Sequence, residues 1–355
     1  MKIFPWWSLC FPVAALLLLG ANGVLHFNGL ALLLLVAALG GTVFSAVHYA
    51  EVVAHKVGEP FGTLVLAVAV TVIEVALIVS VLISKGGENT AVARDTIFSA
   101  IMIVCTGVVG LCLAVGAGRH REQELNIKGS SGALSVLIAL AGLTLVLPDF
   151  TASPGPTFNI YQLEFVGVVS LVLYAIFVFV QTVRHRDYFL PEDDSHVAHH
   201  PPPSTGQTLA ALGALLVCLV AVVALAKSLS PTIEAFVNHS GLPESVVGLV
   251  IAGFVLLPES LAAVRAALHN KLQTSLNLAF GSVIASIGLT IPVVAAVSVF
   301  MGNSLTLGLD QKEIVLLVLS MLLSMLTVST GRTTILQGAI HLTVFAVFLF
   351  FAVVP

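Results

Sequence analysis

The sequence predicts an all-α polytopic membrane protein with about eleven transmembrane helices: one N-terminal helix followed by two inverted repeats of five. Three observations predict this class. Apolar residues make up 58% of the chain, charged residues only 9%, and the mean hydropathy is +1.08, whereas about a quarter of the residues in a soluble domain are charged. Eleven apolar stretches are long enough to span a bilayer. Two of these stretches resemble each other.

The predicted spans follow one another with short connections. They cover residues 9–26, 29–50, 61–84, 95–117, 131–149, 162–183, 207–228, 245–266, 274–300, 312–328 and 334–354. The first also fits a cleaved signal peptide, because Lys2 precedes a short apolar core and Ala21-Asn22-Gly23 follows it. The predicted organisation is an N-terminal transmembrane helix (1–28), a first five-helix repeat (29–183), a cytoplasmic linker rich in acidic residues and histidine (184–206) and a second five-helix repeat (207–355).

The distribution of Lys and Arg predicts the orientation, because cytoplasmic loops carry an excess of both. With the N-terminus cytoplasmic, ten of the fourteen fall inside: Lys2, Lys56, Arg119, Arg121, Lys128, Arg184, Arg186, Arg265, Lys271 and Arg332. Four fall outside: Lys85, Arg94, Lys227 and Lys312. We therefore expect a multi-pass protein of the cell inner (plasma) membrane with its C-terminus on the periplasmic or extracellular side.

Two glutamates, Glu74 and Glu259, lie inside the similar stretches. At a constant offset of 185, residues 59–74 and 244–259 are identical at six of sixteen positions, both glutamates included. A carboxylate at bilayer depth costs roughly 2.5–3.5 kcal/mol, so it rarely persists without a function. A repeat of five helices inverts the second copy, and transporters with inverted repeats bind their substrate at the repeat interface. The pattern predicts a secondary transporter that binds cations and protons at Glu74 and Glu259.

Polar groups near the two glutamates are typical of an ion site. Thr71 precedes Glu74 by about one helical turn and shares its face. Pro258 directly precedes Glu259 and frees a backbone carbonyl. Ser282 and Ser286 add hydroxyl oxygens from the next span, although small residues of this kind also pack helices. We predict Glu74 and Glu259 as the cation ligands, with Thr71, Ser282 and Ser286 assisting.

Further charged and polar residues lie near the span ends. Four of them are candidates for a vestibule or gate: Glu59, Glu244, Asp95 and Asn277. His48, Glu51 and His55 share one helix face and form a candidate cytoplasmic proton relay, although such a face is more often simply solvated. The linker, which contains Pro201-Pro202-Pro203, has a composition typical of disorder. Its clustered His and Asp residues are also compatible with a sensor of cytoplasmic cations or pH, which is the less favoured alternative.

Other classes of protein are less compatible with the sequence. No HExxH, GxSxG or nucleotide-binding motif is present, so we expect neither an enzyme nor a cofactor, nucleotide or nucleic-acid partner. The expected partners are inorganic cations, protons and the lipid bilayer. The four cysteines lie in apolar runs without CxxC spacing and read as buried hydrophobic residues. A passive cation channel lined by carboxylates remains the alternative.

An ordered set of short motifs resembles the cation/proton exchangers of the calcium:cation antiporter superfamily, in particular the ChaA-type bacterial calcium/sodium–proton antiporters. These motifs are Gly58-Glu59-Pro60-Phe61-Gly62-Thr63-Leu64, Ile73-Glu74-Val75, Arg94-Asp95-Thr96, Pro258-Glu259, residues 265–270, Asn277-Leu278, Gly281-Ser282-Val283 and residues 329–333. The resemblance implies ten core helices in two inverted repeats. It also implies that the two glutamates are shared by Ca²⁺, Na⁺ or K⁺ and by protons.

The chain departs from the vacuolar members of this superfamily at three positions. Those members carry asparagine three residues before each glutamate, where this chain has Thr71 and Leu256. A further position that is polar in those members, four residues after Gly281, holds Ala285 in this chain. Because Ca²⁺ prefers six to eight oxygen ligands, these replacements weaken the prediction of a dedicated calcium site. The resemblance supports calcium, sodium and potassium without ranking them.

Overall fold

The protein is helical throughout the residues that the computed structural model describes, which are 4–22, 29–58, 61–84, 91–189, 203–240, 243, 245–302 and 304–354. Nine helices in these ranges are long and apolar enough to cross a membrane, and two more are apolar but shorter. The predicted all-α polytopic class is confirmed. Every predicted span coincides with a helix, although several helices extend beyond the apolar core of their span.

The helices fall into two compact units, each built from both halves of the chain. The first unit comprises residues 1–87 and 197–241, and the second comprises 88–196 and 242–355. These units are defined by contacts, whereas the predicted boundaries concern repeats in the sequence. The repeat boundaries therefore stay a prediction.

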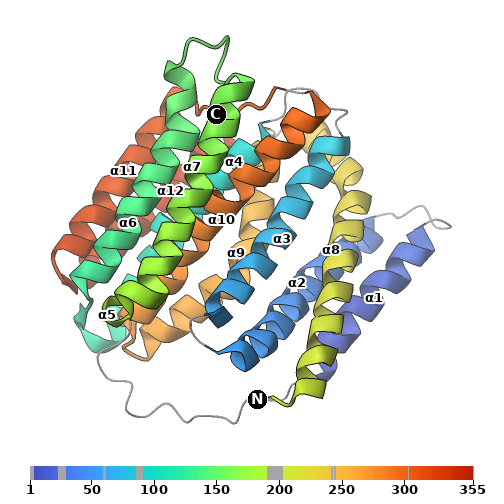
Figure 1. The fold of residues 1–355 in the computed structure, drawn as a ribbon, viewed down its shortest axis with the longest axis horizontal. Helices are drawn as coiled ribbons and strands as arrows, with labels where there is room; N and C mark the ends of the chain where they lie inside the picture. Colours follow the sequence, from blue (N-terminus) through green and yellow to red (C-terminus); the bar gives the residue numbers. More distant parts are fainter. Residues whose placement is uncertain are drawn as a thin grey trace. The chain divides into compact units, whose positions relative to one another are not determined.

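The first unit contains four helices (Figure 1): α1 (Trp6–Asn22), α2 (Gly29–Val57), α3 (Phe61–Ser84) and α8 (Thr205–Ser240). Helix α2 packs against the other three. The hydroxyl groups of Ser8 on α1 and Tyr49 on α2 lie 3.0 Å apart and form a buried hydrogen bond. This bond ties the N-terminal helix to α2 without any charged group.

The second unit contains the remaining helices (Figure 1). They are α4 (Val92–Met102), α5 (Val109–His120), α6 (Ile127–Ala141), α7 (Ile160–Phe179), α9 (Ser245–Leu268), α10 (Leu272–Met301), α11 (Gln311–Ser329) and α12 (Ile335–Val353). A π-helix, η1 (Ile103–Val108), joins α4 to α5 within one continuous span. Further π-helical turns are η2 (Gly142–Val146) and η4 (Val180–Arg184), and short 3₁₀ turns are η3 (Leu147–Phe150) and η5 (Arg186–Tyr188).

Close packing in the second unit depends on glycine. A Cβ atom at Gly248 of α9 would lie 2.7 Å from the backbone of Asp95 on α4. A Cβ at Gly338 of α12 would lie 2.5 Å from the backbone nitrogen of Ala114 on α5. Small residues at such crossings allow membrane helices to approach closely, and dispersion contacts then stabilise the pair. The pairs α4–α9 and α5–α12 are accordingly among the most extensive helix contacts in this unit.

One small antiparallel sheet lies at the end of the second unit where α5 ends and α12 begins. Strand β1 (Gln123–Glu124) pairs with β2 (Arg332–Thr333), with Gln123 opposite Thr333. The buried Gln123 side chain donates to the Ala267 carbonyl and to Asn270, each at 3.0 Å. The sheet therefore links the α5–α6, α9–α10 and α11–α12 connections.

Candidate functional site

Helix α3 carries the first predicted ligand group. Glu74 is 3% exposed and Thr71, one turn earlier, is 5% exposed. Val70 and Ile73 beside them are also buried. A carboxyl group in such surroundings must be protonated or must share its charge with a cation or a hydrogen-bond donor. The burial of Glu74 is thus what a cation and proton site requires.

Helices α9 and α10 of the second unit carry the second group. Glu259 is partly buried and follows Pro258, which lies inside the helix α9. On α10, which packs against α9, Ser286 is buried and Ser282 is partly buried. Thr290, one turn beyond Ser286, is fully buried, and its hydroxyl oxygen hydrogen-bonds to no described residue. Ser282, Ser286 and Thr290 are spaced by four residues and therefore share one face of α10.

Glu74 belongs to the first unit and Glu259 to the second, so a shared site at the midplane stays a prediction. Two predicted vestibule residues, Glu59 and Glu244, lie outside the described residues. Within the described ranges, no group of three or more His, Cys, Asp or Glu side chains is arranged to hold a metal ion. A transported cation would need hydroxyl and carbonyl oxygens in addition to carboxylates.

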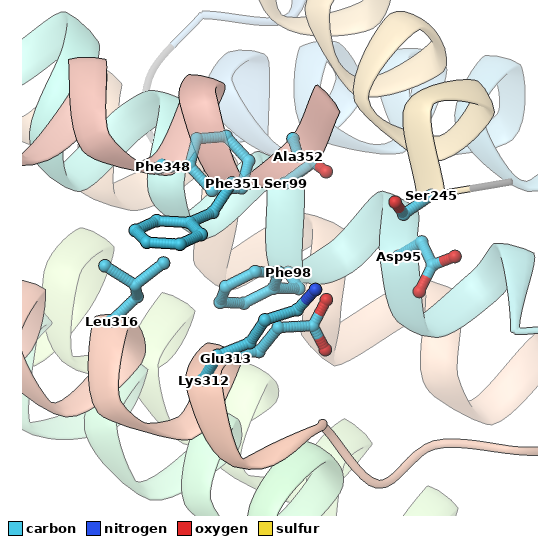
Figure 2. Close-up of a pocket in the computed structure, with 10 residues that line it drawn as sticks. All are labelled: Asp95, Phe98, Ser99, Ser245, Lys312, Glu313, Leu316, Phe348, Phe351 and Ala352. Carbon is cyan, nitrogen blue, oxygen red and sulfur yellow. The ribbon is translucent and has the colours of Figure 1, made fainter. Parts of the chain in front are cut away.

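A small cavity lies where α4, α9 and α11 begin and α12 ends (Figure 2). It encloses about 30 Å³ and is lined by Asp95, Phe98, Ser99, Ser245, Lys312, Glu313, Leu316, Phe348, Phe351 and Ala352. Half of the lining residues are apolar, and Asp95, Lys312 and Glu313 supply its charged groups. Of the four predicted vestibule or gate residues, Asp95 lines this cavity. Glu313 also lines the cavity and was not predicted as a site residue.

Arg94 holds this end of the second unit together. Its Nε donates to the Asp95 carboxylate at 2.8 Å, and a terminal nitrogen donates to the Gly308 carbonyl at 3.2 Å. The pair is well shielded, with side chains 13% and 4% exposed. The carboxylates of Asp149, Asp310 and Glu313 also lie within electrostatic range of Arg94. Carboxylates thus outnumber cationic groups around this cavity, which favours the approach of cations.

The other end of the unit carries an amide network. The side-chain nitrogen of Asn277 donates to the Phe189 carbonyl at 2.5 Å, and the vestibule role of Asn277 stays a prediction. Gln273 donates to Asn277 at 2.9 Å and accepts from the backbone of Asn126 at 2.8 Å. Asn277 therefore anchors the start of the linker to α10. Most of the linker, residues 190–202, lies outside the described residues.

The candidate relay residues lie on α2 as expected, but their surroundings differ. The His48 ring centroid is 5.2 Å from Trp7 and 5.7 Å from Tyr49, so this imidazole packs against aromatic rings. Glu51 and His55 are exposed. The aromatic contacts of His48 indicate a packing role in addition to any proton transfer, and the relay itself stays a prediction.

Sequence reasoning missed a buried histidine, His341 on α12, which is 1% exposed. Its Nδ1 lies 2.7 Å from the Cys105 carbonyl oxygen of η1, and its Nε2 lies 3.0 Å from the Thr327 hydroxyl of α11. An ionisable residue at membrane depth was the available signal. It went unnoticed because it stands alone in an apolar span.

Buried carboxyl groups in apolar helices, together with a cation-attracting cavity, define a membrane transporter for cations. Residues 24–183 and 210–354 match the sodium/calcium exchanger protein family. The chain belongs to this family and is a cation/proton antiporter of the calcium:cation antiporter superfamily.

Relatives match along the whole chain. It is 48% identical over 359 residues to the "Putative ionic transporter y4hA" of Sinorhizobium fredii, covering 99% of this chain and 97% of that protein. It is 38% identical over 353 residues to the "Sodium-potassium/proton antiporter ChaA" of Escherichia coli, covering 96% and 94%. Among solved structures, native YfkE matches with a TM-score of 0.76 at 17% identity, covering 98% of this chain and 100% of that one. The last match concerns the fold alone.

Proposed function

We propose that this antiporter exports monovalent cations, Na⁺ and K⁺, from the cytoplasm across the inner membrane in exchange for protons, with Ca²⁺ as a weaker substrate. The burial of Glu74 in an apolar helix is the observation that supports this proposal most directly. The E. coli relative is named a sodium-potassium/proton antiporter, and this similarity favours the monovalent ions. Where the vacuolar exchangers carry asparagine, Thr71 supplies one hydroxyl oxygen and Leu256 supplies no side-chain oxygen. The site therefore has fewer ligands toward the six to eight oxygens that Ca²⁺ prefers.

The proposed mechanism is competition for one site by alternating access. The mechanism requires Glu74 and Glu259 to act on the same ion, and two neighbouring carboxylates cannot both ionise at low cost. A cation entering from the cytoplasm displaces a proton, and after the site turns outward, protons displace the cation. An empty site with two negative charges is costly to occlude. The transporter therefore changes state only when it is loaded, and this rule couples the two fluxes.

The cavity beside Asp95 and Glu313 serves in this proposal as the outer vestibule. Its carboxylates concentrate cations and protons at the end of the second unit where α12 ends. This assignment follows the predicted orientation, with the C-terminus on the periplasmic or extracellular side. The Arg94–Asp95 ion pair lies at the start of α4 beside this vestibule.

The test is proton flux in proteoliposomes with an acid interior, to which Na⁺, K⁺ or Ca²⁺ is added. We expect alkalinisation with Na⁺ and K⁺, a smaller response to Ca²⁺, and loss of all responses in Glu74→Gln and in Glu259→Gln. Glu164→Gln is the matched control, because this glutamate is exposed on α7 and should leave exchange unchanged. Cation uptake without proton movement would instead identify a passive channel, and normal exchange in either glutamine variant would refute the mechanism.

A further inference from the structure

The π-helix η1 lies at the centre of the second unit. Five of its six residues are buried, and it contacts α9, α10, α11 and α12. Helix α9 bears Glu259, and α10 bears Ser282 and Ser286. A π-helical turn changes the register of backbone hydrogen bonds and occurs frequently at functional sites. The shape of η1 therefore influences the spacing of the two helices that carry the proposed ligands of this unit.

His341 is bonded directly to this turn. A carbonyl oxygen can only accept, so the contact between Nδ1 and the Cys105 oxygen places the ring proton on Nδ1. In the neutral ring Nε2 then accepts, and the Thr327 hydroxyl donates to it at 3.0 Å. One imidazole thus joins α12, η1 and α11 through two directional hydrogen bonds in a water-poor interior.

The packing around the ring brings these groups together. A Cβ at Gly110 would lie 2.9 Å from the Cβ of His341, so the absent side chain allows α5 and α12 to approach. Ser324 on α11 is 1% exposed, and α11 packs against η1, which carries Cys105. The ring therefore has little freedom to move away from the Cys105 carbonyl.

Proton transport by His341 itself is not supported by this arrangement. The described titratable residues on the elements that contact α12, with α4 included through Phe98 and Phe348, are Arg94, Asp95, Cys105, Cys112, Arg119, His120, Glu259, Arg265, Lys312 and Glu313. The hydrogen bonds that the structure gives the ring go instead to a carbonyl and a hydroxyl. Neither group compensates a full positive charge, and an imidazolium without a counter-charge is costly to bury. The neutral ring is suited to holding a backbone group in place.

We propose that His341 is a positioning residue that holds the π-helix η1 and thereby sets the cation affinity of the site on α9 and α10. This inference rests on the proposed function for its transport readout. Losing the imidazole leaves the Cys105 carbonyl without its side-chain donor, and a π-helical turn without that support relaxes toward the ordinary α-helical register. Ser282, Ser286 and Glu259 then lose their alignment.

Two amide substitutions separate this role from simple packing. In His341→Asn the side-chain nitrogen falls where Nδ1 was and can still donate to the Cys105 carbonyl. In His341→Gln the amide instead falls near the former position of Nε2, next to Thr327. We expect His341→Gln and His341→Ala to raise the apparent KM for the cation about tenfold, equivalent to about 1.4 kcal/mol. The maximal rate should stay within about twofold of wild type, and His341→Asn should restore the KM.

Hydrogen–deuterium exchange of the peptide covering 103–109 tests the same idea without transport. Exchange should accelerate about tenfold in His341→Gln and His341→Ala, and stay unchanged in His341→Asn. Thr343→Val, an exposed threonine on α12, is the control and should change neither measurement. Unchanged exchange and KM in the glutamine variant, or an asparagine variant as impaired as alanine, would overturn the proposal.

The glutamate variants keep this proposal separable from the transport mechanism. Glu259→Gln should abolish cation/proton exchange while leaving deuterium exchange of residues 103–109 as in the wild type. If Glu259→Gln transports normally, the two-glutamate mechanism fails, and the deuterium exchange of the His341 variants still decides whether the histidine holds η1.

Discussion

The close contact between α5 and α12 allows the effect of Gly338→Ala on helix spacing to be calculated. In Gly338→Ala the new Cβ would lie 2.5 Å from the Ala114 nitrogen and 2.9 Å from its Cα. Ordinary van der Waals contact begins at 3.4 Å, so α12 must move away from α5 by about 0.9 Å. The substitution lies one turn before His341, whose Nδ1 is 2.7 Å from the Cys105 carbonyl oxygen. A shift of this size lengthens that distance to about 3.6 Å, which is too long for a hydrogen bond.

The expected effect on stability is moderate. Overpacking of a close contact costs about 1–3 kcal/mol, and replacing glycine by alanine inside a helix returns about 1 kcal/mol. The net loss of up to about 2 kcal/mol should lower the melting temperature by up to roughly 3 °C. Gly132→Ala on α6 is the control, because a Cβ there meets nothing within 4 Å. Its melting temperature should stay equal to that of the wild type or rise.

A thiol-reactive dye suits this measurement better than tryptophan fluorescence. Both tryptophans, Trp6 and Trp7, lie in the first unit, whereas Cys105 and Cys112 are fully buried in η1 and α5 of the second. With the exposed Cys10 replaced by serine, labelling during heating reports mainly on buried thiols. If Gly338→Ala were as stable as Gly132→Ala, the inferred closeness of α5 and α12 would be wrong.

Three further substitutions test other contacts. Asp95→Asn removes the charge that balances the buried Arg94, so we expect the free energy of unfolding to fall by about 1–3 kcal/mol. The melting temperature should then be lower, and a melting temperature equal to that of the wild type would contradict this expectation. Asn126→Ala removes the N-cap of α6, with an expected loss of about 1 kcal/mol by the same assay. Arg332→Ala breaks an exposed 2.7 Å pair with Glu124, and a change larger than about 0.5 kcal/mol would show that the pair is not simply solvated.

Hydropathy predicted the helices well but not their ends. The span expected at 29–50 belongs to a helix that continues to Val57, and the span expected at 207–228 continues to Ser240. Hydropathy reports which residues suit lipid, whereas helix ends depend on backbone hydrogen bonds and on residues such as His48 and Glu51 that are helical without being apolar. The predicted positions of Glu74 and Thr71 on a buried face rest on helical periodicity, and the structure agrees.

The parts that escaped prediction depend on contacts between distant residues. The amide of Asn277 donates to Phe189, which is 88 residues away. The π-helix η1 has no sequence signal of its own, because its register depends on His341, which is 236 residues from Cys105. Local composition contains no information about such pairs. By contrast, Arg94 and Asp95 are neighbours in the sequence, so their pairing depends on no distant residue.

The two-stranded sheet has a consequence for how the chain is made. Strand β1 follows α5, but its partner β2 begins only at Arg332, just before the last helix. Contacts between residues so far apart cannot form until nearly the whole chain has left the ribosome, and such non-local contacts slow folding. During synthesis the face of α5 that contains Gly110 therefore lacks its packing partner α12. A nascent chain that stalls before residue 335 would expose this face and become a substrate for membrane quality-control proteases.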